Sequence, residues 1–145
     1  MGEKYDVAII NPYSISNRTA EESLALGYLV SVLETVGYKV LVVDAWLGGM
    51  GLEDVMRVVD NDGRIPPIVC FSCYRSNLIQ AREILHRLVC QFGKFVSVCG
   101  GYGPTFHDEE FLAAGFDIVV RGEAEKVIIL LVNVLIANGD LRNVP

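Results

Sequence analysis

Residues 95–105 read Phe-Val-Ser-Val-Cys-Gly-Gly-Tyr-Gly-Pro-Thr and join a short apolar run to a loop with three glycines in four residues. Similar runs, rich in Val and Ile, occur at four other places along the chain. They predict five strands: Tyr5–Ile10, Lys39–Asp44, Pro67–Ser72, Phe95–Cys99 and Asp117–Arg121. Nearly continuous hydrophobicity of this kind is typical of parallel strands buried on both faces.

Stretches with helical periodicity separate these runs. Thr19 and Glu22 form a capping-box pattern for the first helix, and Gly37 stands where its end favours a glycine. Further helices are predicted over Leu52–Asp60, onward from a Ser76 cap, over Asp108–Ala114 and over Glu123–Ala137. Strands alternating with helices predict one α/β domain, residues 1–145, with a five-stranded parallel sheet and helices on both of its faces.

Composition excludes several classes of function. The chain has 145 residues, is 52% hydrophobic and carries a formal net charge of −6 without a block of basic residues. This balance argues against a nucleic-acid groove or an anionic membrane surface as partner. No apolar stretch approaches the roughly 20 residues that a membrane-spanning helix needs. We expect a cytoplasmic protein with no membrane or nucleic-acid partner, whose four cysteines are reduced thiols.

The last predicted helix is unusual, because from Val127 to Ala137 its only polar residue is Asn133. A helix that is apolar all round is normally buried on more than one face. Two interpretations are open: an unusually apolar terminal helix, or a helix covered by a following domain or a second subunit. The end at Asn143-Val144-Pro145 favours a piece of a longer protein.

Ligands of such sheets bind beyond the carboxyl ends of the strands, so the loops that follow the strands are the candidate site. The glycines at 100, 101 and 103 allow a ligand to approach the backbone closely, although a tight turn explains them equally well. The loop is not a dinucleotide fingerprint, which would follow the first strand, and no phosphate-binding GxxxxGK[ST] is present. A phosphoacceptor domain is disfavoured because Asn11, Ser72 and Arg121-Gly122 replace its acidic and lysine positions.

The cysteines and histidines give little indication of a metal or redox site. Cys70 and Cys73 have redox or zinc spacing, but Cys70 lies within a predicted buried strand and no second pair completes a tetrahedral site. Cys90 and Cys99 are interpreted as helix and strand residues. His86 is predicted on a helix surface and His107 in a loop, and we expect structural roles for both.

Four segments in this order resemble the N-terminal cobalamin-binding domain of cobalamin-dependent radical S-adenosylmethionine (SAM) enzymes. They are 26–34, 37–40, the glycine loop that ends in Thr105-Phe106, and 117–125, so the resemblance covers nearly the whole chain. It implies a Rossmann-like fold with the flavodoxin strand order and a corrinoid at the carboxyl ends of the strands.

The resemblance also implies residue roles. Ser72, Gly100, Gly101 and Thr105 match positions that line the nucleotide tail of cobalamin, and the segments 13–17 and 74–77 would face the corrin ring. Bulk at Gly101 is expected to abolish corrinoid binding without unfolding the domain. The complete set of predicted cofactor-binding residues is Tyr13, Ser14, Ser16, Asn17, Ser72, Tyr74, Arg75, Asn77, Gly100, Gly101, Tyr102, Thr105, Gly122 and Glu123.

The sequence also departs from related patterns. The loop after the first strand lacks the DxHxxG motif of methionine-synthase-type domains, so no cobalt-ligating histidine is expected from it. Gly103 stands where many relatives have His, and Ala124 stands where many relatives have Gly. The chain lacks CxxxCxxC, so SAM and an iron–sulfur cluster are expected only in a downstream domain that packs on the last helix. The alternatives are a stand-alone corrinoid carrier, an interaction domain without cofactor, and a flavin- or nucleotide-binding domain.

Overall fold

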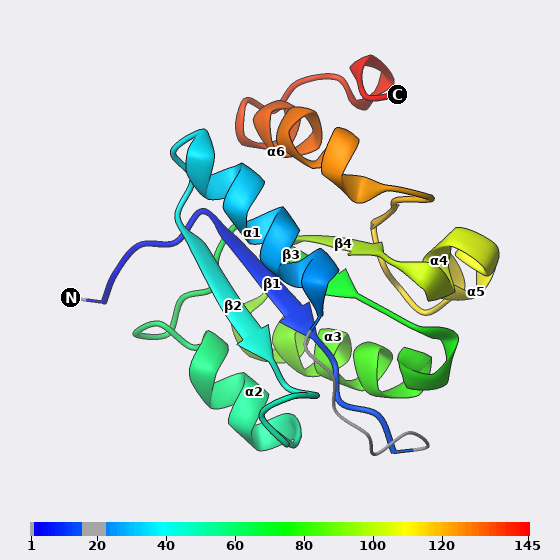
Figure 1. Ribbon diagram of the computed structural model, residues 1–145. Helices are drawn as coiled ribbons and strands as arrows, with labels where there is room; N and C mark the ends of the chain where they lie inside the picture. Colours follow the sequence, from blue (N-terminus) through cyan, green and yellow to red (C-terminus); the bar gives the residue numbers. More distant parts are fainter. Residues whose placement is uncertain (1, 16–22) are drawn as a thin grey trace.

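The computed structural model describes residues 2–15 and 23–145. Its centre is a parallel sheet with the strand order β2-β1-β3-β4-β5 (Figure 1). The five predicted strands are confirmed, and so is the flavodoxin order implied by the resemblance. Their bounds are β1 Val7–Asn11, β2 Val40–Asp44, β3 Ile68–Ser72, β4 Val96–Gly100 and β5 Ile118–Val119.

The last strand, β5, ends at Val119 and begins one residue later than the predicted Asp117–Arg121, because side chains replace its first ladder bonds. The Asp117 carboxylate accepts hydrogen bonds from the Ser97 backbone N–H at 2.8 Å and from the Ser97 hydroxyl at 2.9 Å. The Asp117 N–H in turn donates to Ser97 Oγ at 3.0 Å. The start of the strand is therefore held to β4 without regular backbone pairing.

Two layers of helices cover the sheet. One contains α1 and α6, and the other contains α2, α3 and α5 (Figure 1). The described residues form α1 Leu24–Thr35, α2 Leu52–Val59, α3 Leu78–Phe92, α4 Tyr102–Phe106, α5 Asp108–Ala113 and α6 Ile128–Ile136. None of the helices in this part of the chain is both long and apolar enough to cross a membrane.

Alternation along the strands divides the core into two clusters. On β1, Val7 and Ile9 face the layer of α1 and α6, whereas Ala8 and Ile10 face the opposite layer. All four side chains are at most 1% exposed. The sheet is thus buried on both faces, which explains why its strands are nearly continuous in hydrophobicity.

The predicted end of the first helix is confirmed. Gly37 has φ +95°, its N–H donates to the Glu34 carbonyl, and the Tyr38 N–H donates to the Leu33 carbonyl, which is the Schellman arrangement. The capping-box pattern of residues 19 and 22 lies outside the described residues. Within them, α1 begins at Leu24, with Ser23 as N-cap.

Two other helix predictions need correction, and one helix was missed. Ser76 is not a cap, because the 3₁₀ turn η1, Arg75–Asn77, precedes α3. The predicted helix Glu123–Ala137 is divided into the 3₁₀ turn η2, Ala124–Lys126, and α6. The short helix α4 was not predicted, because Gly103 and Pro104 have low helix propensity.

The apolar helix α6 is buried on one side only. Ile128, Leu131 and Val132 pack against the sheet and α1. Its single polar residue, Asn133, accepts a hydrogen bond from the Tyr38 hydroxyl. Leu130 is 41% exposed and lies on the side turned away from that core, so this domain alone leaves part of the helix uncovered.

Candidate functional site

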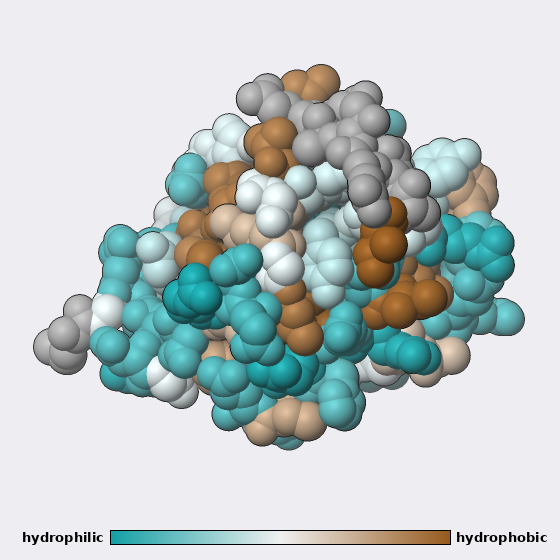
Figure 2. Space-filling view, turned by 90° about the horizontal axis from the view of Figure 1, so that it is seen from below, coloured by the Kyte–Doolittle hydropathy of each residue, from teal (hydrophilic) through white to brown (hydrophobic). Residues whose placement is uncertain are grey.

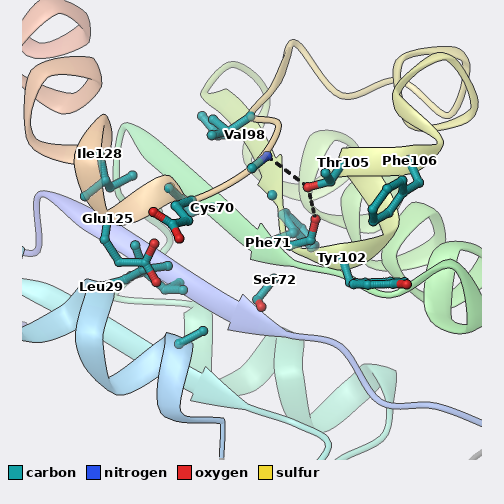
Figure 3. Close-up of a pocket in the computed structure, with 18 residues that line it drawn as sticks. Leu29, Cys70, Phe71, Ser72, Val98, Tyr102, Thr105, Phe106, Glu125 and Ile128 are labelled. Atoms are coloured by element: carbon teal, nitrogen blue, oxygen red, sulfur yellow. Dashed lines mark hydrogen bonds between the residues drawn. The ribbon is translucent and has the colours of Figure 1, made fainter. Parts of the chain in front are cut away.

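A cavity of about 330 Å³ opens at the carboxyl edge of the sheet, between α1, α6 and the loops after β4 and β5 (Figure 3). This size lies in the range of small-molecule sites. Seven predicted residues line it: Ser72, Gly100, Gly101, Tyr102, Thr105, Gly122 and Glu123. Residues that the prediction missed complete the lining: Ile9, Ala25, Leu29, Cys70, Phe71, Val98, Phe106, Val120, Ala124, Glu125 and Ile128.

The strands supply the floor of the cavity in two rows. Ile9 is in register with Cys70, and Cys70 with Val98, so these three side chains form one apolar row across the sheet. Two residues further along, Ser72 is in register with Gly100 on the same face. This second row is made of small residues and leaves the apolar row accessible from the edge. The period-2 alternation of the strands is the signal that could have identified the floor residues.

The glycine loop is held against the loop after β3 by backbone hydrogen bonds. The Cys73 N–H donates to the Gly100 carbonyl at 2.8 Å, and the Gly103 N–H donates to the Cys73 carbonyl at 2.9 Å. A Cβ atom on Gly103 would lie 2.6 Å from the Tyr74 carbonyl carbon. Gly103 is therefore required by this packing, which gives a structural reason for the departure seen in the sequence.

Gly101 is constrained in the same way, and this corrects one expectation. Its φ is +109°, and a Cβ there would lie 2.8 Å from the Cys73 carbonyl oxygen. A bulky residue at Gly101 would therefore disturb the loop itself and not only the ligand. Gly100 differs, because a Cβ there would have its nearest contacts, with Val120, at 3.7 Å. Gly100 is the position where bulk enters the cavity without a backbone clash.

Thr105 connects two loops at the mouth of the cavity. Its hydroxyl donates to the Gly101 carbonyl at 2.7 Å and accepts from the Gly122 N–H at 3.0 Å (Figure 3). The hydroxyl proton is thus already used. Thr105 fixes the shape of the mouth, and only the remaining lone pair of its oxygen is available to a ligand.

Aromatic rings follow one another along the rim. Trp46 and Tyr74 meet edge to face with centroids 5.7 Å apart, Tyr74 lies 6.5 Å from Tyr102, and Tyr102 lies 4.9 Å from Phe106. Tyr102 is 70% exposed and Phe106 is 63% exposed. On the face seen in Figure 2, hydrophobic residues form separate patches among hydrophilic ones. The exposed rings of the rim can therefore offer apolar faces to a large flat ligand.

The other predicted residues that the structure describes lie outside the cavity lining. Tyr13 is half-buried and its hydroxyl donates to Glu83 at 3.1 Å; burial and this carboxylate raise the pKa of Tyr13 to about 12. Ser14 is half-buried in the same loop. Arg75 makes two contacts with the Glu110 carboxylate, at 3.3 and 3.1 Å.

Asn77 differs most from its predicted role. It is fully buried, its Oδ1 accepts from the Tyr74 N–H at 3.0 Å, and its Nδ2 donates to the Pro12 carbonyl at 3.3 Å. Its side chain therefore joins the loops after β1 and β3 and is not presented at the rim. Ser16 and Asn17 lie outside the described residues.

Glu123, at the mouth of the cavity, is held in an ion pair. Glu123 contacts Lys126 at 2.7 Å, and the hydrogen bond from this ammonium group lowers the pKa of Glu123. His107 lies 3.4 Å from Glu110, and His86 lies on α3 beside Cys90. Neither histidine lines the cavity.

The thiols of the CxxC pair do not converge on one point. Cys70 belongs to the cluster under α1 and α6, whereas Cys73 belongs to the cluster on the other face of the sheet. Burial raises the pKa of Cys70 to about 12 and that of Cys73 well above its usual value, so both remain neutral. The described residues contain no group of three or more His, Cys, Asp or Glu side chains able to hold a metal ion.

Comparisons with known proteins identify the family of this chain. The B12 binding domain family matches residues 15–132, so the chain belongs to that family. The predicted family and its cofactor, cobalamin, are thereby confirmed. The cavity fits this group, because small residues at its mouth and an apolar floor suit the flat base at the end of the flexible nucleotide tail.

Individual relatives are longer than this chain. The anaerobic magnesium-protoporphyrin IX monomethyl ester cyclase of Synechocystis sp. is 28% identical over 155 residues. The match covers 95% of this chain and 29% of the cyclase. The radical SAM methyltransferase TsrM of Kitasatospora setae, in a structure with cobalamin and a [4Fe-4S] cluster bound, superposes with a TM-score of 0.78 at 21% identity. That match covers 96% of this chain and 26% of TsrM. The chain thus spans less than a third of either relative.

The same fold occurs in a protein with a different description. A CheY-like protein, TadZ of Pseudomonas aeruginosa, superposes with a TM-score of 0.59 at 16% identity, over 88% of this chain and 98% of that one. Likeness of fold alone does not specify the ligand. The family match and the cavity, not the strand order, therefore carry the functional assignment.

Proposed function

We propose that this chain is the cobalamin-binding module of a longer, cytoplasmic radical SAM enzyme, and that it presents the corrinoid for methyl transfer or related radical chemistry. The observation that carries the proposal is the cavity whose small row, Ser72 and Gly100, opens onto the apolar row of Ile9, Cys70 and Val98. In the proposed complex the corrin ring would lie over the rim, and the nucleotide tail would pass over the paired residues Ser72 and Gly100 toward the apolar row.

The residues of this chain bind and orient the cofactor in this proposal. Gly101 and Thr105 keep the mouth open in one shape, and Tyr74 and Tyr102 offer ring faces at the rim. Bound cobalamin supplies a cobalt centre that carries a methyl group or takes part in related radical chemistry. SAM and the iron–sulfur cluster belong to the downstream domain.

The exposed side of α6 favours a module over a stand-alone carrier. Two apolar side chains of this helix are exposed: Leu130 is 41% exposed and Ile136 is 43% exposed. Both relatives extend well beyond the matched region. A following domain packed on α6 would bury these side chains.

The proposal is tested by titrating the 145-residue chain with hydroxocobalamin, desalting it and recording its absorption spectrum. We expect retained corrinoid with a spectrum that lacks histidine ligation, since neither histidine lines the cavity. Gly100→Leu should lose the corrinoid while its circular dichroism stays native.

The matched control is Gly27→Leu, which adds the same bulk on the exposed side of α1, where a Cβ has nothing within 4 Å. It should retain the corrinoid. A native but colourless wild-type chain after desalting would overturn the binding proposal. Full retention by Gly100→Leu would instead overturn only the placement of the tail.

A further inference from the structure

Polarity changes sharply between the mouth and the floor of the cavity. The floor row of Ile9, Cys70 and Val98, with Leu29 and Ile128 beside it, offers only the thiol of Cys70 as a polar group (Figure 3). That thiol is a weak hydrogen-bonding group and stays protonated. The backbone of the three floor strands is paired within the sheet. The side chains of this floor row therefore offer a ring almost no hydrogen-bonding partner.

Several backbone groups nearer the mouth already have hydrogen-bond partners. The Gly122 N–H is taken by Thr105, the Gly100 carbonyl by the Cys73 N–H, and the Val120 N–H by the Cys99 carbonyl. The lining carboxylates, Glu123 and Glu125, come from the segment between β5 and α6 and not from the floor strands. The floor strands themselves thus add little hydrogen-bonding capacity beyond the Cys70 thiol.

This distribution discriminates between bases at the end of a nucleotide tail. A purine such as adenine carries ring nitrogens and an amino group around its six-membered ring. On such a floor these polar atoms lose their hydrogen bonds to water and gain almost none from the floor side chains. 5,6-Dimethylbenzimidazole carries two methyl groups at the corresponding edge, and their burial is favourable. Both bases are flat and similar in width, so polarity and not size separates them.

We infer that the cavity selects corrinoids whose nucleotide tail ends in an apolar benzimidazole over those whose tail ends in a purine. This inference rests on the proposed function, since it concerns the tail of the same cofactor. Cys70 is the specificity-determining position, because it is the middle member of the floor row and the only one with a polar atom.

The test compares the dissociation constants of three corrinoids for the 145-residue chain: cobalamin, the analogue with adenine as base, and cobinamide, which has no base. All three are used as dicyano forms, in which cyanide occupies both axial positions of cobalt and any base is already free. We expect cobalamin to bind at least tenfold more tightly than the adenine analogue, and the adenine analogue to bind no more tightly than cobinamide.

Two variants locate the preference at the floor. Cys70→Ser places a hydroxyl there and should reduce the preference for cobalamin to threefold or less, whereas Cys70→Ala should retain it. Equal binding of cobalamin and the adenine analogue by the wild-type chain overturns the inference and leaves the proposed function intact. Failure of all three corrinoids to bind overturns the proposed function and the inference with it.

Discussion

Replacing Gly101 with alanine tests the structural account of the glycine loop directly. The backbone of Gly101 has φ 109° and ψ −168°, a region that is almost restricted to glycine. The new Cβ would also lie 2.8 Å from the carbonyl oxygen and 3.1 Å from the backbone nitrogen of Cys73. Both atoms take part in the hydrogen bonds that join the loops after β3 and β4. The substitution therefore forces either the loop or its partner to move.

The expected loss of stability has two parts. An alanine in this backbone region costs about 1–3 kcal/mol. Crowding against backbone atoms that cannot rotate away costs about 1–3 kcal/mol more. The free energy of unfolding should therefore fall by about 2–6 kcal/mol, a large share of the roughly 5–15 kcal/mol typical of a domain. With a urea m-value of about 2 kcal/mol/M, the midpoint of unfolding should fall by about 1–3 M.

Gly100→Ala is the matched control, because it adds the same methyl group one residue earlier. Its Cβ would have only ordinary contacts, at 3.7 Å, and its backbone conformation is open to any residue. We expect its free energy of unfolding to stay within about 1 kcal/mol of wild type. Urea unfolding followed by circular dichroism measures both variants. A Gly101→Ala protein as stable as Gly100→Ala would refute the account of the loop.

Two further predictions concern single hydroxyl groups. Thr105→Val removes the hydrogen bonds to Gly101 and Gly122, and should lower the free energy of unfolding by about 1–2 kcal/mol. Thr105→Ser keeps the hydroxyl and should lose much less stability in the same urea experiment. Equal losses in the two variants would contradict the bridging role. For Tyr13, the pKa is raised from 10.0 to about 12 in the folded chain, so its contribution to stability is present below pH 10 and is lost as the pH rises toward 12. Comparing urea unfolding of wild type and Tyr13→Phe from pH 8 to 12 should show the smaller decline in the variant, and identical declines would exclude Tyr13 as a contributor.

Much of the fold was predictable because the residue pattern of each segment matches the place of that segment in the folded domain. Short runs rich in Val and Ile predicted the five strands, since strands covered on both faces need apolar residues at nearly every position. Gly37 predicted the end of α1 because its positive φ is required there. Helix beginnings were harder to predict: the side chain of Asn77 is used to join two loops, so α3 starts after a 3₁₀ turn and not at a Ser76 cap.

About half of the predicted site residues line the cavity, and the division follows the strand ends. Ser72, Gly100 and Thr105 lie there because the carboxyl ends of neighbouring parallel strands meet at one edge. Tyr13 and Arg75 follow strands too, but their side chains are paired with carboxylates on α3 and α5, which lie on the other face of the sheet. A sequence shows which loops share an edge of the sheet, but not the direction in which each loop turns from it.

By itself, the sequence determined the α/β class, the carboxyl-edge position of the site and the family, because these depend on patterns that are local along the chain. The tertiary structure alone decided the register that sets Ile9, Cys70 and Val98 side by side as a cavity floor. It also decided that Gly101 and Gly103 serve the contact between two loops, whereas a side chain at Gly100 would make only ordinary contacts with Val120. The physical reason is that register and close approach are relations between segments distant in sequence, and these relations form only when the sheet assembles.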